Sequence, residues 1–86
     1  MDYFDYRDKA LFAESVPVSD LVDQFGTPLY IYSAKTLRRH YDAFDTALAS
    51  LDHLTCFSVK ANGNIHLLRL LGNLGAGVDI VSGGEL

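Results

Sequence analysis

Several residue types are scarce or missing, and each shortage excludes a class of protein. Cys56 is the only cysteine, so the chain cannot form an internal disulfide, and it lacks the cysteine and histidine pairs of a zinc site. A reducing, cytoplasmic location is therefore expected. Tryptophan is absent, and no window approaches the ~18 apolar residues of a membrane span. The acidic N-terminal stretch has no apolar signal segment, so we expect neither export nor a membrane partner.

Basic residues are also few. Seven Lys and Arg stand against eleven Asp and Glu, which gives a net charge of −4. The densest basic spot is the pair Arg38 and Arg39, which is too small to neutralise a phosphate backbone. We therefore expect no nucleic-acid partner.

The charged residues are unevenly distributed over the 86 residues. Residues 1–53 hold 14 of the 18 charged side chains, and residues 54–86 hold the other four. A compact chain of this mass buries only about 63% of its extended surface, so an independent core would be marginal. We therefore expect these residues to begin a longer chain, and we expect the 86 residues alone to be prone to aggregation or partly unfolded and to lack activity.

Two short apolar runs in the second half flank an apolar helical pattern. Residues 54–59 and 77–82 are typical of buried strands, and residues 65–74 are typical of a helix that Asn64 can cap. The order strand, helix, strand predicts a parallel pair with a right-handed crossover.

Helix signals also punctuate the first half. Ser19 is predicted to cap a helix over 18–25 that stops at Gly26, and residues 29–32 resemble a strand. Ser33 is predicted to cap a second helix from Ala34 to about Ser50. The apolar stripe of that second helix is predicted to be core and consists of Leu37, Tyr41, Phe44 and Leu48.

Lys60 follows the first apolar strand directly. In sheets of βα units, reactive groups lie at the carboxyl ends of the strands. The next residues, 61–64, read Ala-Asn-Gly-Asn and predict a tight turn. A lysine desolvated there could attack a carbonyl carbon, although an ordinary surface lysine at a strand end fits the same position.

The motifs around this lysine resemble a known family. Residues 56–64, Cys-Phe-Ser-Val-Lys-Ala-Asn-Gly-Asn, are followed by Gly-Val-Asp over 77–79 and by Ser-Gly-Gly-Glu-Leu over 82–86. Together with the lead-in Phe-Gly-Thr-Pro-Leu-Tyr over 25–30, they resemble the pyridoxal-phosphate-dependent decarboxylases with an alanine-racemase-type barrel. Ser58 departs from the Ala or Pro that is more usual in that family.

The resemblance implies an α/β fold class. Residues 34–86 would form the first βα units of a (β/α)8, TIM-type barrel of the alanine racemase and group IV decarboxylase type. Residues 1–33 would belong to the second, β-rich domain.

The resemblance also implies site residues and a cofactor. Lys60 matches the lysine that holds pyridoxal 5'-phosphate, and it would be both catalytic and cofactor-binding. Asp79 matches an aspartate beside that lysine, where a carboxylate can pair with a protonated amine. From the residues alone, the favoured interpretation of Asp79 is a strand-edge residue that caps a neighbouring loop. Glu85 is left without an assigned role, and no metal site is expected.

The implied reaction is decarboxylation of a small amino acid, meso-2,6-diaminopimelate, to L-lysine and CO2 by a homodimer. Related decarboxylases of ornithine, arginine or carboxynorspermidine remain alternatives, as does a non-catalytic barrel that binds the cofactor. A stand-alone interaction domain is the alternative from a different class.

Other reactive residue types are interpreted as structural. His53 and His66 are predicted to be surface or packing residues. Cys56 is predicted to be a small buried hydrophobe within its strand.

Overall fold

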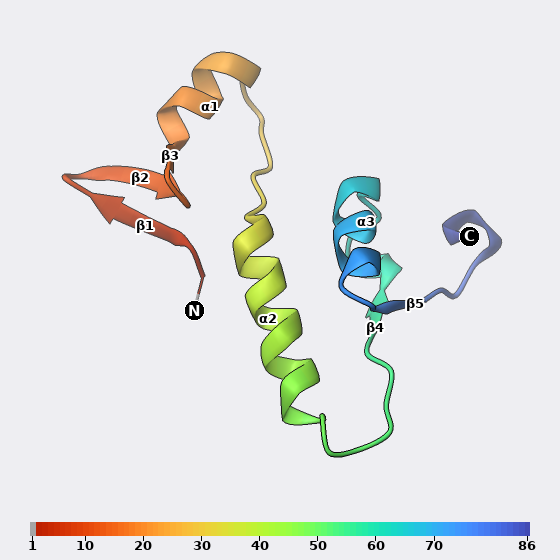
Figure 1. The fold of residues 1–86 in the computed structure, drawn as a ribbon. Coiled ribbons are helices and arrows are strands. Elements are labelled where there is room, and N and C mark those ends of the chain that lie inside the picture. The colour runs from red at the N-terminus through yellow and green to blue at the C-terminus, as the bar shows by residue number, and fades with distance from the viewer. Residues whose placement is uncertain (1) are drawn as a thin grey trace. The chain divides into compact units, whose positions relative to one another are not determined.

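The computed structural model describes residues 2–86, which divide into two compact units, one ending at Leu37 and the other running from Arg38 to Leu86. The first unit carries three strands and a helix, and a second helix begins in it (Figure 1). These elements are β1 (Phe4–Arg7), β2 (Ala10–Ala13), β3 (Val16–Pro17), α1 (Val18–Phe25) and α2 (Ala34–Ala47). The second unit carries β4 (Cys56–Ser58), the 3-10 turn Val59–Ala61, α3 (Ile65–Asn73), β5 (Gly77–Asp79) and the 3-10 turn Gly83–Glu85.

Strands β1, β2 and β3 form a small antiparallel sheet that the sequence patterns did not predict. Arg7 pairs with Ala10, so only Asp8 and Lys9 connect β1 to β2, and both have positive φ angles of 50° and 69°. Positive φ at both central residues is the geometry of a type I′ hairpin turn, whose twist matches that of the strands. The turn uses Asp-Lys in place of the usual Asn-Gly or Asp-Gly signal.

Helix α1 has the predicted bounds but a different N-cap residue. Pro17 occupies the N-cap position, with φ −61° and ψ 132°, and no side chain caps the helix there. Ser19 is therefore not the cap, because it is already the second helical residue. The predicted stop is confirmed, since Gly26 follows the helix with φ 76°, a conformation that glycine adopts without steric cost.

The predicted strand over residues 29–32 is wrong. These residues form no regular element, and none of the strands among residues 2–86 pairs with them. A strand is defined by its ladder of hydrogen bonds, and an alternating pattern alone does not supply a partner.

Helix α2 is capped by Ser33, as the sequence predicts. The Ser33 Oγ accepts a hydrogen bond from the Thr36 amide (3.0 Å) and donates one to Glu14 Oε2 (2.7 Å). Glu14 Oε2 also accepts from the Lys35 amide at 3.1 Å. A carboxylate from the β2–β3 turn thus supplements the cap, where the positive end of the helix dipole favours a negative charge.

Replacing Ser33 by alanine is expected to lower the free energy of unfolding by about 1 kcal/mol, because the variant loses the cap of α2. Ser33 is only 6% exposed, so water does not replace the lost bond easily. Urea titration of the purified protein measures the change. Ser19→Ala is the matched control, since Ser19 is exposed and caps nothing. An equal loss in both variants would contradict the capping role.

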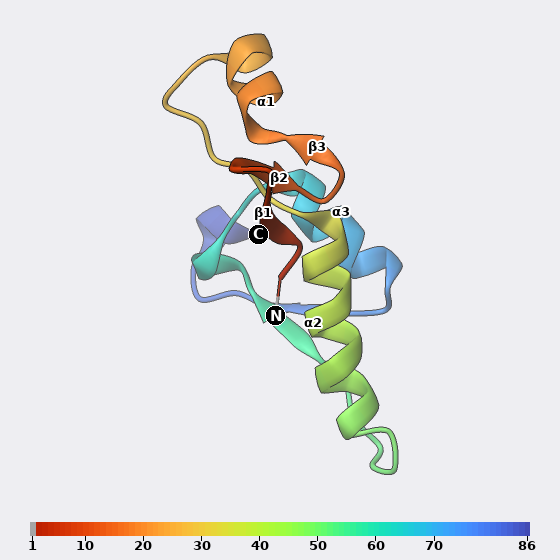
Figure 2. The same cartoon turned by 90° about the vertical axis from the view of Figure 1, so that its left-hand side faces the viewer.

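In the second unit, β4 and β5 pair in parallel and α3 connects them, which confirms the predicted strand, helix, strand order (Figures 1 and 2). Cys56 pairs with Gly77 and Ser58 with Asp79. Both strands are three residues long, shorter than the predicted runs. Asn64 caps α3 by accepting a hydrogen bond from the His66 amide at 2.9 Å, as predicted.

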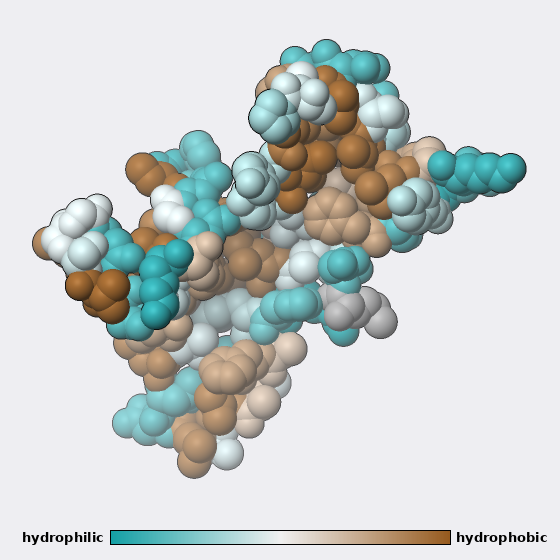
Figure 3. Space-filling view, turned by 180° about the vertical axis from the view of Figure 1, so that it is seen from behind, coloured by the Kyte–Doolittle hydropathy of each residue, from teal (hydrophilic) through white to brown (hydrophobic). Residues whose placement is uncertain are grey.

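Few side chains are buried among the described residues. The buried apolar residues are Ala13, Val59 and Leu71, and many large apolar side chains are open to solvent, as the brown surface in Figure 3 shows. The predicted core stripe of α2 is therefore only partly correct. Leu37, Tyr41 and Leu48 are half-buried, whereas Phe44 is 59% exposed because no described element covers it.

Candidate active site

Lys60 lies immediately beyond the carboxyl end of β4. The strand ends at Ser58, and Val59–Ala61 form a 3-10 turn in which Val59 is buried and Lys60 is exposed. The predicted position at a strand end is confirmed, but the predicted desolvation by the strand is wrong. In this tight turn, Val59 takes the inward position and its neighbour Lys60 lies at the surface.

Asp79 is the last residue of β5. Its register partner is Ser58, two residues before Lys60, so both candidate residues lie at the carboxyl end of the same parallel pair. Asp79 is exposed, and no ion pair joins it to Lys60 within residues 2–86. The topology brings the two residues to one edge without bringing their charged groups into contact.

The turn after Lys60 is held by its own side chains. The Asn62 amide donates to the Val59 carbonyl at 3.0 Å, and the Asn62 Oδ1 accepts from the Asn64 amide at 3.0 Å. Asn64 Oδ1 in turn caps α3. These local bonds fix the backbone on the C-terminal side of Lys60.

Glu85, for which the sequence indicates no role, contacts the backbone just before its own turn. Its Oε1 accepts hydrogen bonds from the amides of Val81 (2.6 Å) and Ser82 (3.3 Å). The side chain therefore folds back onto the residues just before the turn Gly83–Glu85, as a carboxylate does in a capping box.

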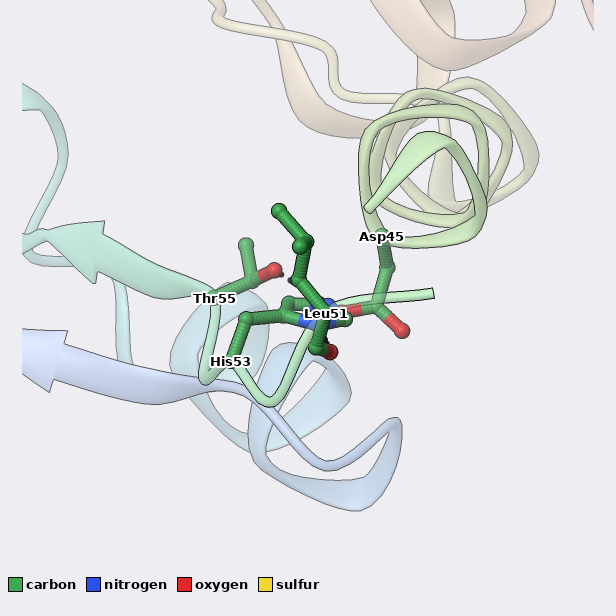
Figure 4. A network of polar contacts seen from close by, with 4 residues as sticks. All are labelled: Asp45, Leu51, His53 and Thr55. Carbon is green, nitrogen blue, oxygen red and sulfur yellow. Dashed lines mark hydrogen bonds and ion pairs between the residues drawn. The ribbon is translucent and has the colours of Figure 1, made fainter. Parts of the chain in front are cut away.

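His53 belongs to a polar cluster that sequence spacing did not reveal (Figure 4). Asp45 Oδ1, on α2, accepts from Thr55 Oγ1 (2.8 Å) and contacts His53 Nε2 (2.9 Å). His53 Nδ1 lies 2.9 Å from the Leu51 carbonyl oxygen. We call these four residues the Asp45 junction. The threonine hydroxyl contacts the carboxylate and not the imidazole, so the cluster is no nucleophile with its base.

The junction favours the charged forms of its two titratable groups. The Leu51 carbonyl, and then the Asp45 carboxylate, raise the pKa of His53 above its ordinary 6.5. The hydrogen bonds from Thr55 and then His53 lower the pKa of Asp45 below its ordinary 3.8. Both shifts favour the ion pair between His53 and Asp45.

The contribution of the junction to stability is expected to depend on pH. The His53 part is complete below pH 6.5 and is lost as the pH rises through the higher folded-state pKa. The Asp45 part is complete above pH 3.8 and is lost as the pH falls through the lower folded-state pKa. Thermal unfolding of the wild type and of His53→Gln over a range of pH values measures this dependence. The gap between their melting temperatures should be widest between these two pH values and should narrow toward alkaline pH; a constant gap would contradict the ion pair.

Cys56 is exposed, so the prediction that it is buried is wrong. It begins a two-stranded sheet with no described layer over its side chain. His66 is exposed in the first turn of α3, as predicted. Within the described part of the chain, no group of three His, Cys, Asp or Glu side chains could hold a metal ion. None of the described helices is long and apolar enough to cross a membrane.

Comparison with known families decides how this arrangement is to be interpreted. The sequence profile of the family described as pyridoxal-dependent decarboxylase, pyridoxal binding domain, matches residues 34–86. The chain belongs to this family. The match begins at the first residue of α2 and includes Lys60, Asp79 and both parallel strands.

Curated relatives extend the similarity to the whole chain. Diaminopimelate decarboxylases of Vibrio cholerae and Haemophilus influenzae are 55% and 52% identical to it, and each match covers 100% of this chain and 21% of the relative. The chain thus spans about a fifth of the length of these relatives.

Solved structures have the same fold. A protein of Aquifex aeolicus superposes with a TM-score of 0.90 at 52% identity, over 96% of this chain and 20% of that chain. A diaminopimelate decarboxylase of Methanocaldococcus jannaschii, solved with L-lysine, gives 0.91 at 32% identity, over 98% of this chain and 21% of that chain. The predicted fold class, the α/β start of a decarboxylase barrel, is confirmed.

The residues of this chain suit the cofactor named by the family. Pyridoxal phosphate presents an aldehyde, which a lysine amine can attack. Lys60 is exposed, and no hydrogen bond or ion pair engages its amine within residues 2–86. Its amine is therefore accessible to an aldehyde at the strand edge.

Proposed function

We propose that this chain is part of a diaminopimelate decarboxylase, which converts meso-2,6-diaminopimelate to L-lysine and CO2 in the last step of lysine biosynthesis. The observation that carries the proposal is identity of 50% or more to seven proteins of that name, over 88–100% of this chain. The accessible Lys60 amine at a strand edge supports it.

In this proposal Lys60 holds pyridoxal 5'-phosphate through its side-chain amine. When bound, the cofactor supplies an electron sink for the electron pair that is released as CO2 leaves. The tight turn Val59–Ala61 and the Asn62 and Asn64 bonds keep the Lys60 backbone in place. Asp79, on the adjacent strand, offers a carboxylate that can stabilise the Lys60 ammonium whenever substrate amine has taken the place of that lysine.

The proposal includes the rest of the protein. Residues 34–86 are assigned to the pyridoxal-binding barrel and residues 1–33 to the second, β-rich domain. The active form is proposed to be a cytoplasmic homodimer that acts on a small-molecule amino acid, with no nucleic-acid or membrane partner.

A substrate panel tests this function. The complete protein, supplied with pyridoxal phosphate, should release CO2 and L-lysine from meso-2,6-diaminopimelate. Ornithine, arginine and carboxynorspermidine are the comparison substrates, because related decarboxylases act on them. Preference for one of these three would assign a different member of the family, and no CO2 from any substrate would contradict enzymatic function.

A further inference from the structure

The Asp45 junction connects three stretches of the second unit at one oxygen atom. Asp45 Oδ1 lies 2.8 Å from Thr55 Oγ1 and 2.9 Å from His53 Nε2. Asp45 belongs to α2, His53 to the connecting segment, and Thr55 directly precedes β4 (Figure 4). The junction therefore connects the end of α2 to the beginning of β4.

Thr55 is bound on two sides. Its side chain donates to Asp45, and its carbonyl oxygen accepts the amide of Gly77 at 2.9 Å. Gly77 is the first residue of β5 and pairs with Cys56. The junction thus holds the residue at which the parallel pair of strands begins.

Lys60 lies at the other end of the same short strand. Only β4 and the buried Val59 separate it from Thr55. Because side chains alternate between faces, a shift of one residue at Thr55 would turn the whole of β4 over. The position of Thr55 therefore determines where Lys60 lies at the end of β4.

We propose that Asp45, His53 and Thr55 are positioning residues that hold β4 in register and so present the Lys60 amine to the cofactor. This inference rests on the proposed function for the role of Lys60. The effect of these residues on the register of β4 concerns only contacts within the second unit, and it can be measured without the cofactor.

The titratable groups around the junction lie on α2 and on residues 48–55, which join α2 to β4. Asp45 is the carboxylate that faces His53, and on the same helix desolvation, followed by the charges of Asp45 and Asp42, raises the pKa of Tyr41. Asp52 adjoins His53 in the connecting segment, and Cys56 adjoins Thr55 at the start of β4. Charged imidazole would donate from both ring nitrogens, to Asp45 and to the Leu51 carbonyl.

Thr55→Val and Thr55→Ser test the inference as a pair. Valine keeps the shape of threonine and loses the hydroxyl, whereas serine keeps the hydroxyl. Hydrogen exchange of the Gly77 amide reports directly on the bond to Thr55, and the Leu68 amide in α3 serves as the internal reference. Asp42→Asn is the control that removes a nearby charge of α2 outside the junction.

In Thr55→Val, the Gly77 amide should exchange roughly tenfold faster at constant pH while Leu68 stays near its wild-type rate. The concentration of pyridoxal phosphate that half-labels Lys60 after borohydride reduction should rise roughly threefold to tenfold. Thr55→Ser and Asp42→Asn should match the wild type in both measurements.

The two possible failures are distinguishable. Wild-type Gly77 exchange or unchanged labelling in Thr55→Val, with a labelled wild type, would overturn the inference alone. An unlabelled Lys60 in the wild-type protein would contradict the proposed function, and with it the role of the junction in cofactor binding.

Discussion

Replacing Lys60 by alanine in the complete protein should abolish covalent attachment of pyridoxal phosphate and lower the rate of decarboxylation by a factor on the order of a thousand or more. Alanine has no amine, and among residues 2–86 no other residue places an amine at the carboxyl end of β4. Absorbance of the bound cofactor and CO2 release measure the two losses separately.

Lys35→Ala is the matched control for Lys60→Ala. Lys35 is also exposed, but it lies at the N-terminal end of α2 and its amine is 4.8 Å from the centre of the Tyr3 ring. Its replacement should leave both cofactor attachment and turnover close to wild type. A Lys60→Ala enzyme that retains full activity would contradict the role of Lys60.

Gly77→Val should lower the free energy of unfolding by about 1–3 kcal/mol, since the added atoms would overlap the side chains of Cys56 and Leu54. A Cβ at Gly77 would lie 2.9 Å from Cys56 Sγ and 3.3 Å from Leu54 Cδ2. Valine favours strands in general, yet here its side chain meets the neighbouring strand before it can be accommodated. Urea titration of the complete protein measures the loss.

Gly72→Val controls for the substitution itself. Nothing lies within 4 Å of a Cβ at Gly72, which is exposed on α3, and valine is the better helix former. The control should change stability by less than about 0.5 kcal/mol. Adding Cys56→Ala to Gly77→Val should recover part of the loss. No recovery would show that the Sγ contact is not its cause.

Elements with local signals could be predicted from the sequence. Ser33 and Asn64 mark helix starts with side chains that bond the first turn, and Gly26 marks a helix end through its positive φ. The parallel pairing of β4 with β5 followed from two apolar runs joined by a helix. The position of Lys60 followed from the same pattern.

Features that depend on a partner could not be predicted. Asp8 and Lys9 form the turn between β1 and β2, although this residue pair is not a strong turn signal. The apolar run at 29–32 has no pairing strand among the described residues. Cys56 and Phe44 were predicted to be buried, but both are exposed. An apolar pattern indicates which side of a helix or strand can pack, but it does not identify the element that packs against it.

The Asp45 junction belongs to the same class of features. Asp45 lies in α2, whereas His53 and Thr55 follow after the helix has ended, so no single helix or strand period relates the three residues. They meet because the chain reverses after α2, where the Leu51 amide donates to the Leu48 carbonyl at 2.9 Å. No one-dimensional pattern contains that reversal.

The most direct test of the account is borohydride reduction of the complete protein with pyridoxal phosphate, followed by mass spectrometry of its peptides. Reduction converts the bond between cofactor and lysine into a stable secondary amine, so the modified residue can be read from the peptide. We expect the cofactor on Lys60, within the peptide that continues Ala-Asn-Gly-Asn. Label on a different lysine, or on none, would contradict it.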